Sequence, residues 1–258
     1  PPSERFAYMF EENNYEVLDT PAINDPSLLS WEDASGKYKD KLSKTRKRTG
    51  LNSAISVAYG KLTENINAVV VASDWRYFGS SIGPDEGESI LYACEKSLKT
   101  NSPLIIFAQG GGMRMQLPSA VSLMQMPRTV LGLSEVKKKN PVIIIADSVV
   151  AGGISASYAA CGDFLFFEGK KTKWMFAGPR VAANASNAEP PEDFLEGSWC
   201  MSHGHGDYMI EQRRDTKNFL VKFLNIILKK DQSSIIGEEN IDNINETTKL
   251  NKETREAS

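Results

Sequence analysis

Short apolar runs alternate with longer helix-forming stretches through the middle of the chain, and this alternation limits the fold more than any other feature. Four runs rich in valine, isoleucine and phenylalanine are typical of buried strands, at residues 66–73, 103–108, 141–146 and 163–168. Helix-forming stretches lie between or beside them, at residues 86–100, 118–139 and from about 154. Pro127 should kink or divide the second of these. Strands joined through helices run parallel, so the sequence predicts an α/β core.

Composition divides the chain into three parts. Residues 1–50 are polar, and we predict that they form an N-terminal extension to a core at residues 51–230. Within the extension, residues 36–48 carry seven basic residues and one acid, which fits either a solvated helix face or a groove for a phosphate-bearing ligand. Residues 231–258 contain seven acids, three bases and no aromatic residue, and we expect a disordered tail.

The overall composition argues against several classes of protein. The net charge of −3 is unlike that of a dedicated nucleic-acid binder. No apolar run reaches about 18 residues, so we expect no membrane-spanning helix. Cys94, Cys161 and Cys200 lie far apart, which favours a reducing compartment and no disulfide scaffold. The chain starts Pro1-Pro2 without a methionine, and we expect an excised or processed piece of a longer protein.

Three glycine-rich junctions each follow a predicted strand. They are Gly79-Ser80-Ser81-Ile82-Gly83, Gly110-Gly111-Gly112 and Ala151-Gly152-Gly153. Glycine lets the backbone approach a ligand closely, and adjacent N–H groups at such a turn can form an oxyanion hole. The alternative for each junction is a tight turn without a function. Three junctions in succession favour a functional site.

Side-chain chemistry offers two further candidates. Ser81 is the central residue of a Gly-x-Ser-x-Gly pattern, which occurs in serine hydrolases and would need His203 or His205 as its base. Cys200, His203, His205 and Asp207 could be taken for metal ligands. Tetrahedral zinc sites usually draw on two separated ligand pairs, and no second pair is present, so a polar loop is the better interpretation.

Two arginines lie beside glycine turns. Arg114 follows the triple glycine, and Arg180 ends the sequence Phe176-Ala177-Gly178-Pro179-Arg180. A guanidinium there could clamp a carboxylate or phosphate, or it could form a buried structural ion pair. The sequence leaves both possibilities open for both residues.

Four motifs together resemble one known family. They are Gly111-Gly112-Met113-Arg114-Met115-Gln116, Ser122-Leu123-Met124-Gln125-Met126, Ala151-Gly152-Gly153-Ile154-Ser155-Ala156-Ser157 and Phe176-Ala177-Gly178-Pro179-Arg180-Val181. Their order and spacing are similar to those of the carboxyltransferase β subunit of multi-subunit acetyl-CoA carboxylase. The segment 37–42 is also similar to that family, and the match runs from about residue 5 to residue 228.

The resemblance implies a crotonase-like fold of repeated ββα units and a partner α subunit of related fold. It implies transfer of a carboxyl group from carboxybiotin, on a separate biotin carboxyl carrier protein, to acetyl-CoA, which gives malonyl-CoA for fatty acid synthesis. The compartment would be the cytoplasm, or the plastid stroma of a plastid-bearing organism. By this resemblance Gly152 and Gly153 form the backbone oxyanion hole. The expected substrate-binding residues are Gly111, Gly112, Arg114, Gly178 and Arg180.

The sequence also departs from the family pattern. The family usually carries an N-terminal four-cysteine zinc ribbon, and without those cysteines we expect no zinc in this chain. Where the family has Gly-Gly-Ala-Arg-Met-Gln-Glu, this chain has Met113 in place of the alanine and Leu117 in place of the acid. Alternatives are therefore a subunit of another biotin-dependent acyl-CoA carboxyltransferase or decarboxylase, a catalytically silent scaffold subunit, or a serine hydrolase that uses Ser81.

Overall fold

The computed structural model describes residues 1–20, 25–178, 183–185 and 191–228. It divides into two units, Pro1–Thr216 and Lys217–Ser258. The first unit contains the sheet and all the features discussed below. The described part of the second unit is the body of one helix, α9 (Thr216–Ile227). The predicted tail at residues 231–258 lies outside the described residues. Within the described ranges, no helix is long and apolar enough to cross a bilayer.

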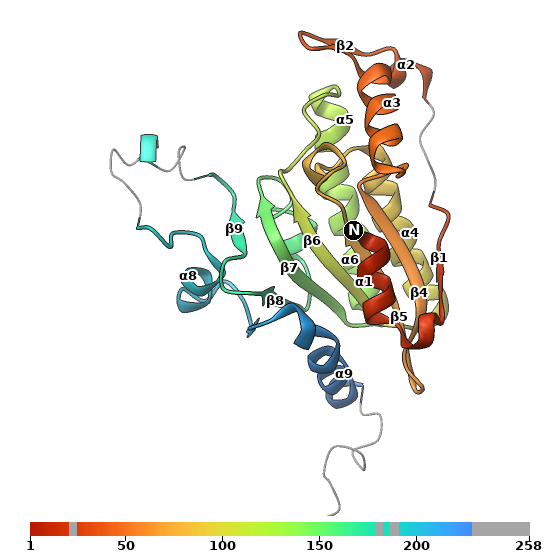
Figure 1. The fold of residues 1–258 in the computed structure, drawn as a ribbon, viewed down its shortest axis with the longest axis vertical. Coiled ribbons are helices and arrows are strands. Elements are labelled where there is room, and N and C mark those ends of the chain that lie inside the picture. The colour runs from red at the N-terminus through yellow and green to blue at the C-terminus, as the bar shows by residue number, and fades with distance from the viewer. Residues whose placement is uncertain (21–24, 179–182, 186–190, 229–258) are drawn as a thin grey trace, which may run out of the picture. The chain divides into compact units, whose positions relative to one another are not determined.

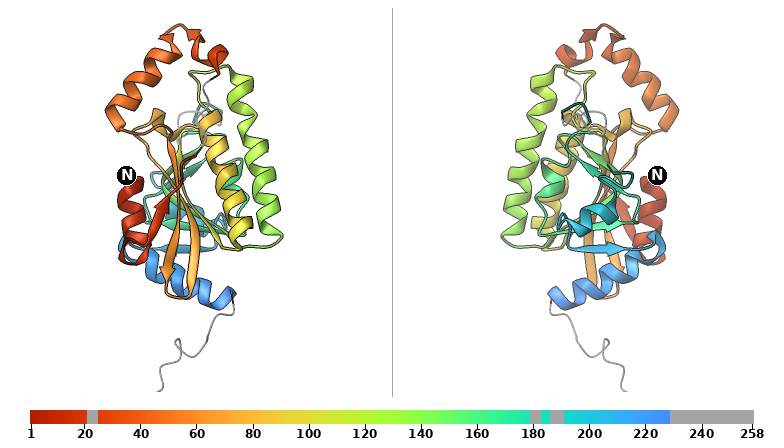
Figure 2. Two further views of the ribbon diagram at one scale, coloured as in Figure 1. Left: turned by 90° about the vertical axis from the view of Figure 1, so that its right-hand side faces the viewer. Right: turned by 90° about the vertical axis from the view of Figure 1, so that its left-hand side faces the viewer.

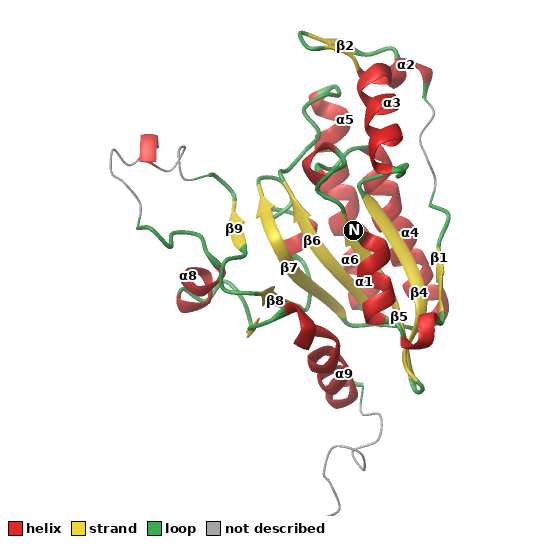
Figure 3. Ribbon diagram, in the orientation of Figure 1, coloured by secondary structure: helices red, strands yellow, loops and turns green. Residues whose placement is uncertain are grey.

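A mixed sheet forms the centre of the first unit (Figures 1 and 3). In the described residues its order is β1-β4-β5-β6-β7-β8-β10, with β9 beside the end of β7. The strands are β1 (Tyr15–Val17), β4 (Ile55–Thr63), β5 (Ile66–Ser73), β6 (Leu104–Gly110), β7 (Val142–Ala151), β8 (Phe164–Glu168), β9 (Lys173–Met175) and β10 (Tyr208–Ile210), and a separate hairpin joins β2 (Glu32–Asp33) to β3 (Gly36–Lys37). Strands β5, β6, β7 and β8 pair in parallel, as predicted, while β4 pairs with β5 in an antiparallel hairpin.

Helices cover both faces of this sheet. Those of the described residues are α1 (Pro2–Met9), α2 (Pro26–Leu29), α3 (Tyr38–Thr49), α4 (Pro84–Thr100), α5 (Ser119–Leu123), α6 (Gln125–Lys137) and α8 (Gly197–Ser202), besides α9. Helices α4 and α6 pack against each other on one face, and α1 packs against β4 and β5 on the opposite face (Figure 2). Because both faces are covered, the central strands are apolar at nearly every position, which explains their continuous hydrophobic runs.

Two predicted helices differ from the structure. The stretch 118–139 does divide, but the break lies at Met124 between α5 and α6, and not at Pro127. Pro127 is tolerated in the first turn of α6, where a helix has no use for the missing N–H. The predicted small-residue helix from about Ile154 is wrong. That stretch forms successive turns and a short 3₁₀ helix at Tyr158–Ala160, so Gly152 and Gly153 do not open an α-helix.

Residues 1–50, predicted as an extension, contribute to the same compact unit as the sheet. Arg5 of α1 donates to both oxygens of Glu168 at 2.7 Å and to Asp147 at 2.9 Å, and it lies 4.1 Å from the centre of the Phe107 ring. Arg213 reaches the same two carboxylates from the solvent side. Burial raises the pKa of Glu168, but the hydrogen bond and charge of Arg5 outweigh burial and hold that pKa below its usual range.

Replacing Arg5 should therefore destabilise the fold. Arg5→Met leaves two buried carboxylates without their main positive partner, and we expect a loss of about 3–5 kcal/mol in the free energy of unfolding. Without that charge the folded-state pKa of Glu168 rises, and the pKa of Asp147, which burial already raises in the wild-type protein, rises further. Both carboxyls then take up protons more readily when folded, so the deficit should shrink as the pH falls toward about 4. Denaturant unfolding at several pH values measures both effects. Arg213→Met is the control, because its side chain is 65% exposed and should matter much less. Equal losses at every pH would contradict this account.

Candidate functional site

The three glycine turns lie against one another at the carboxyl ends of β5, β6 and β7. The N–H of Gly111 donates to the carbonyl of Gly79 at 3.1 Å, which joins the first turn to the second. The second turn meets the third so closely that a Cβ atom on Gly112 would lie 3.2 Å from the nitrogen of Gly153. The N–H of Gly152 donates to the carbonyl of Met175 at 3.0 Å, which joins the third turn to β9. The site is thus a stack of backbone turns.

Only glycine fits two of these positions. Gly112 has a φ of +108° and Gly152 a φ of +59°, conformations that other residues rarely adopt. A Cβ on Gly152 would also lie 3.3 Å from the carbonyl oxygen of Gly111. Close contact and positive φ therefore both require glycine at the meeting of the second and third turns.

Several N–H groups at this meeting point are available to a ligand. Those of Gly112, Met113 and Gly153 donate to no other group in the described part of the chain. An N–H without a partner in a partly buried turn costs free energy unless water or a ligand accepts from it. Donors on two adjacent turns are the arrangement that stabilises a developing oxyanion.

The free N–H donors differ from the expected pair, Gly152 and Gly153. The N–H of Gly152 is engaged by Met175, so Gly152 supports the turn and does not offer a free donor. The available donors are Gly153 on the third turn and Gly112 or Met113 on the second. A Cβ atom on Gly153 would lie 2.6 Å from the terminal methyl of Met126 on α6. A side chain there would displace the end of the Met126 side chain beneath the turn.

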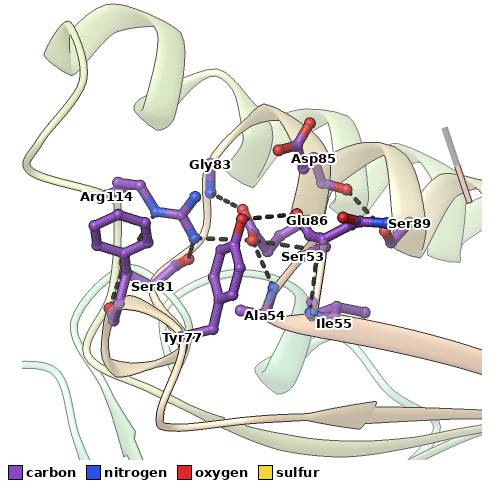
Figure 4. Close-up of polar contacts among 12 residues, drawn as sticks. Ser53, Ala54, Ile55, Tyr77, Ser81, Gly83, Asp85, Glu86, Ser89 and Arg114 are labelled. Atoms are coloured by element: carbon purple, nitrogen blue, oxygen red, sulfur yellow. Dashed lines mark hydrogen bonds and ion pairs between the residues drawn. The ribbon is translucent and has the colours of Figure 1, made fainter. Parts of the chain in front are cut away.

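Arg114, expected to bind substrate, is fully buried (Figure 4). Its guanidinium pairs with Glu86 at 2.8 Å and donates to the carbonyl of Ser81 at 2.7 Å and to the hydroxyl of Tyr38 at 3.2 Å. The ring of Phe78 lies 4.7 Å away. Burial alone would lower the pKa of Arg114, but the charge of Glu86 outweighs burial and raises it. Of the two possibilities left open by the sequence, the structure shows the buried ion pair.

This ion pair fixes the glycine turns. The carboxylate of Glu86 also accepts from the N–H groups of Gly83 and Ala54, at 2.9 and 2.8 Å. The backbone of Arg114 donates to Ile82 at 2.8 Å, and the N–H of Ile82 donates to Gly112 at 2.8 Å. Arg114 and Glu86 therefore hold the first and second turns in register. Both act as positioning residues.

Sequence reasoning missed Glu86, and a local signal for it exists. Glu86 lies three residues after Gly83, and Pro84 occupies the first position of α4. An acid at that third position commonly accepts from the N-cap backbone N–H, as Glu86 does. Its second partner, Arg114, is 28 positions further along the chain and gives no such signal. Leu117, where the family pattern has an acid, lies in an apolar cluster with Tyr38 and Tyr77.

The side-chain alternatives find little support in the geometry. The hydroxyl of Ser81 donates to the carbonyl of Phe78 at 2.7 Å, so it is not directed at an imidazole base. The two histidines stack on Trp199, with ring centres 3.9 Å (His203) and 6.1 Å (His205) from the indole. Across the described ranges, no group of three or more His, Cys, Asp or Glu residues is placed to hold a metal ion.

The last expected site residues lie at and beyond the end of β9. Gly178 is described and comes within 4.0 Å of the sulfur of Met175 at its Cβ position. Met175 is the residue whose carbonyl receives the N–H of Gly152, so Gly178 is close to the stack of turns. Arg180 lies outside the described residues. Phe176 lies between Met175 and Gly178 in the sequence. Its side chain is 74% exposed and presents an apolar ring beside the turns.

Ser81→Ala distinguishes a serine hydrolase, which needs the Ser81 hydroxyl, from a site made of backbone N–H groups, which does not. The substitution removes one hydroxyl and its hydrogen bond to Phe78, so activity of the assembled enzyme should fall less than about tenfold. Steady-state rates measure the effect of the substitution on activity, and labelling by a fluorophosphonate detects a nucleophilic serine. Complete loss of activity together with labelling of Ser81 would establish a nucleophilic serine and overturn the backbone site.

Comparison with known sequences shows the family. A model of the carboxyl transferase domain matches residues 27–255. The acetyl-coenzyme A carboxylase carboxyl transferase subunit beta of Pelagibacter ubique is 40% identical over 240 residues, which cover 93% of this chain and 75% of that protein. The subunit of the same name from Mesorhizobium japonicum is 35% identical over 228 residues, covering 88% and 72%.

Solved structures show the same fold at lower identity. A transcarboxylase 12S structure superposes with a TM-score of 0.70 at 19% identity, covering 86% of this chain and 41% of that one. A Pseudomonas malonate decarboxylase hetero-dimer gives a TM-score of 0.63 at 16% identity, covering 86% and 84%. These neighbours confirm the predicted crotonase-like fold. With stacked glycine turns, this fold and these relatives, the chain belongs to the carboxyl transferase domain family, in the group of acetyl-CoA carboxylase carboxyl transferase β subunits.

Proposed function

We propose that this chain transfers a carboxyl group from carboxybiotin, held on a biotin carboxyl carrier protein, to acetyl-CoA, and so forms malonyl-CoA for fatty acid synthesis. The observation that carries the proposal is the set of free N–H groups on two adjacent glycine turns. Family membership supplies the reaction class. We further propose that the reaction takes place in the cytoplasm, or in the plastid stroma of a plastid-bearing organism.

The chemistry needs donors for negative charge more than it needs a nucleophile. When the acetyl methyl passes its proton to the biotin nitrogen that has released CO2, charge develops on the thioester oxygen, and the N–H groups of Gly153 and of Gly112 or Met113 would donate to it. Because these donors are backbone atoms in fixed turns, they need no reorganisation as the charge appears. Carboxybiotin, when bound, supplies the carboxyl group. The same edge of free donors is open to its urea carbonyl.

The first glycine turn also has a cationic neighbour that suits coenzyme A. A cavity of about 400 Å³ is lined by Arg48, Thr49, Trp75, Arg76, Phe78 and Gly79. Arg48 lies in the last turn of the basic helix α3 and donates to the carbonyl of Arg76 at 2.6 Å. Lys44 and Lys47 of α3 are exposed, whereas Lys41 is paired with Asp33. Positive charge at this position would attract the phosphates of coenzyme A in a salt-dependent manner.

Reconstitution tests the proposal directly. The chain alone should form no malonyl-CoA, because the free donors lie on one open edge and a second subunit of related fold is expected to close it. With its cognate α subunit and a carrier protein whose biotin is already carboxylated, it should carboxylate acetyl-CoA in preference to propionyl-CoA. An assembled complex that carboxylates neither thioester would indicate a scaffold subunit. Preference for propionyl-CoA would indicate another acyl-CoA carboxylase.

Substitution of Gly153 tests the donor itself. Gly153→Pro removes the N–H, and loss of one aligned oxyanion donor typically costs about 10²–10³ in kcat. Gly153→Ala is the matched control, because it keeps the N–H and its Cβ meets only the flexible end of Met126. We expect the alanine variant to stay within about tenfold of the wild-type rate. Thermal unfolding of both variants checks that the fold is retained. A folded proline variant with near-normal transfer would remove Gly153 from the oxyanion hole.

A further inference from the structure

The third glycine turn is a β-turn in which both central residues are glycine. It spans residues 151–154 and is closed by the N–H of Ile154, which donates to the carbonyl of Ala151 at 3.2 Å. Its first central residue, Gly152, has a φ of +59°, whereas Gly153 has no positive φ, which is the pattern of a type II′ turn. Rotating the central peptide by about 180° would give a type I′ turn instead. Glycine tolerates positive φ at either position, so the turn residues themselves do not prevent this rotation.

The orientation of this central peptide decides where the N–H of Gly153 points. The carbonyl of Gly152 and the N–H of Gly153 belong to one planar trans peptide group, so they point in opposite directions. A contact that fixes the carbonyl of Gly152 therefore fixes the N–H of Gly153 as well. After a rotation of the peptide, that N–H would point to the opposite side of the turn and would no longer lie beside the donors of Gly112 and Met113.

A buried hydroxyl, that of Ser155, holds the carbonyl of Gly152. The hydroxyl oxygen lies 2.9 Å from the carbonyl oxygen of Gly152 and 2.7 Å from that of Met175, so two acceptors share one proton. The N–H of Gly152 donates to the same Met175 carbonyl, which joins the three residues in one ring of hydrogen bonds. Ser155 is only 6% exposed. The N–H of Ala156 is a second donor to the carbonyl of Gly152, at 3.2 Å.

A second buried serine in the same loop provides a comparison. Ser157 is 4% exposed, its hydroxyl donates to the carbonyl of Gly153, and its oxygen lies 3.2 Å from the sulfur of Met126. The carbonyl of Gly153 belongs to the next peptide along the chain, whose N–H, on Ile154, already donates within the turn. Ser157 therefore holds a peptide without a free donor, whereas Ser155 holds the peptide that carries one.

We infer that Ser155 is a positioning residue of the oxyanion site, and that it holds the central peptide of the third turn so that the N–H of Gly153 faces the thioester oxygen. The inference rests on the proposed function, because that function supplies the thioester. Ser155 acts through the backbone and not on the substrate itself. A hydrogen bond accepted by the carbonyl also polarises the peptide, which strengthens its N–H as a donor. Because Ala156 holds the same carbonyl, loss of the Ser155 hydroxyl should weaken the donor without abolishing it.

Turnover by the assembled complex tests the inference. Ser155→Ala should lower kcat by about tenfold, the size expected for one lost hydrogen bond, while the KM for acetyl-CoA changes less than about twofold. Ser157→Ala is the matched control, since it also removes one buried hydroxyl from a glycine carbonyl, and its kcat should stay within about twofold of wild type. Ser155→Thr keeps the hydroxyl and should recover most of the lost rate. Thermal unfolding should fall by similar amounts in the two alanine variants.

A double variant shows whether Ser155 acts through Gly153. Gly153→Pro removes the donor, so adding Ser155→Ala to it should lower kcat no further. A role of Ser155 in general stability would lower kcat by the same factor with and without the proline. That result, or equal losses of kcat in Ser155→Ala and Ser157→Ala, would overturn the inference.

A measurement on the chain alone separates this inference from the proposed function. In protein labelled with ¹⁵N-glycine, the residual dipolar coupling of the Gly153 amide reports the direction of its N–H. We expect Ser155→Ala, but not Ser157→Ala, to change this coupling. If the coupling changes while the wild-type complex carboxylates neither thioester, Ser155 still fixes the Gly153 N–H and only the proposed function fails. An unchanged coupling in Ser155→Ala overturns the inference, even if the wild-type complex makes malonyl-CoA.

Discussion

The fully buried ion pair between Arg114 and Glu86 is the interaction on which the rest of the site depends. It joins the loop after β6 to the start of α4, and through Ala54 to the start of β4. A buried charge must be paired, so neither partner can leave without a large cost in stability. The pair thereby fixes the register of the first two glycine turns. A site made of backbone donors needs such an anchor, because no side chain of its own can adjust.

The proposed backbone site explains why the side chains of this chain give little indication of its chemistry. The free donors belong to Gly112, Met113 and Gly153, and two of these residues have no side chain at all. What matters is the placement of N–H groups, which depends on turn geometry and on neighbours such as Met126 beneath the third turn. The inner side of helix α6 thus supports the proposed oxyanion site through Met126.

Much of the fold followed from the sequence. The continuous apolar runs predicted the ends of the central strands to within five residues, and the alternation with helices predicted their parallel pairing. The predicted site residues remain a proposal, but the structure shows where they lie and what they contact. The glycine turns do meet, but Gly152 donates to Met175, and Arg114 pairs with Glu86 in the interior. The contacts of the N-terminal residues with the sheet leave no local signal in the sequence, because their partner carboxylates are more than 140 positions away.

The sequence by itself determined what depends on neighbours along the chain. It determined which segments are buried strands, where glycine interrupts them, and the family through the order and spacing of its motifs. Only the tertiary structure decided which N–H groups remain free and which charge meets Arg114. Those properties depend on contacts between residues far apart in sequence, such as Arg5 with Glu168, and a local pattern carries no record of its distant partner. A hydrogen bond to one distant carbonyl, that of Met175, is enough to leave Gly153 and not Gly152 with a free N–H.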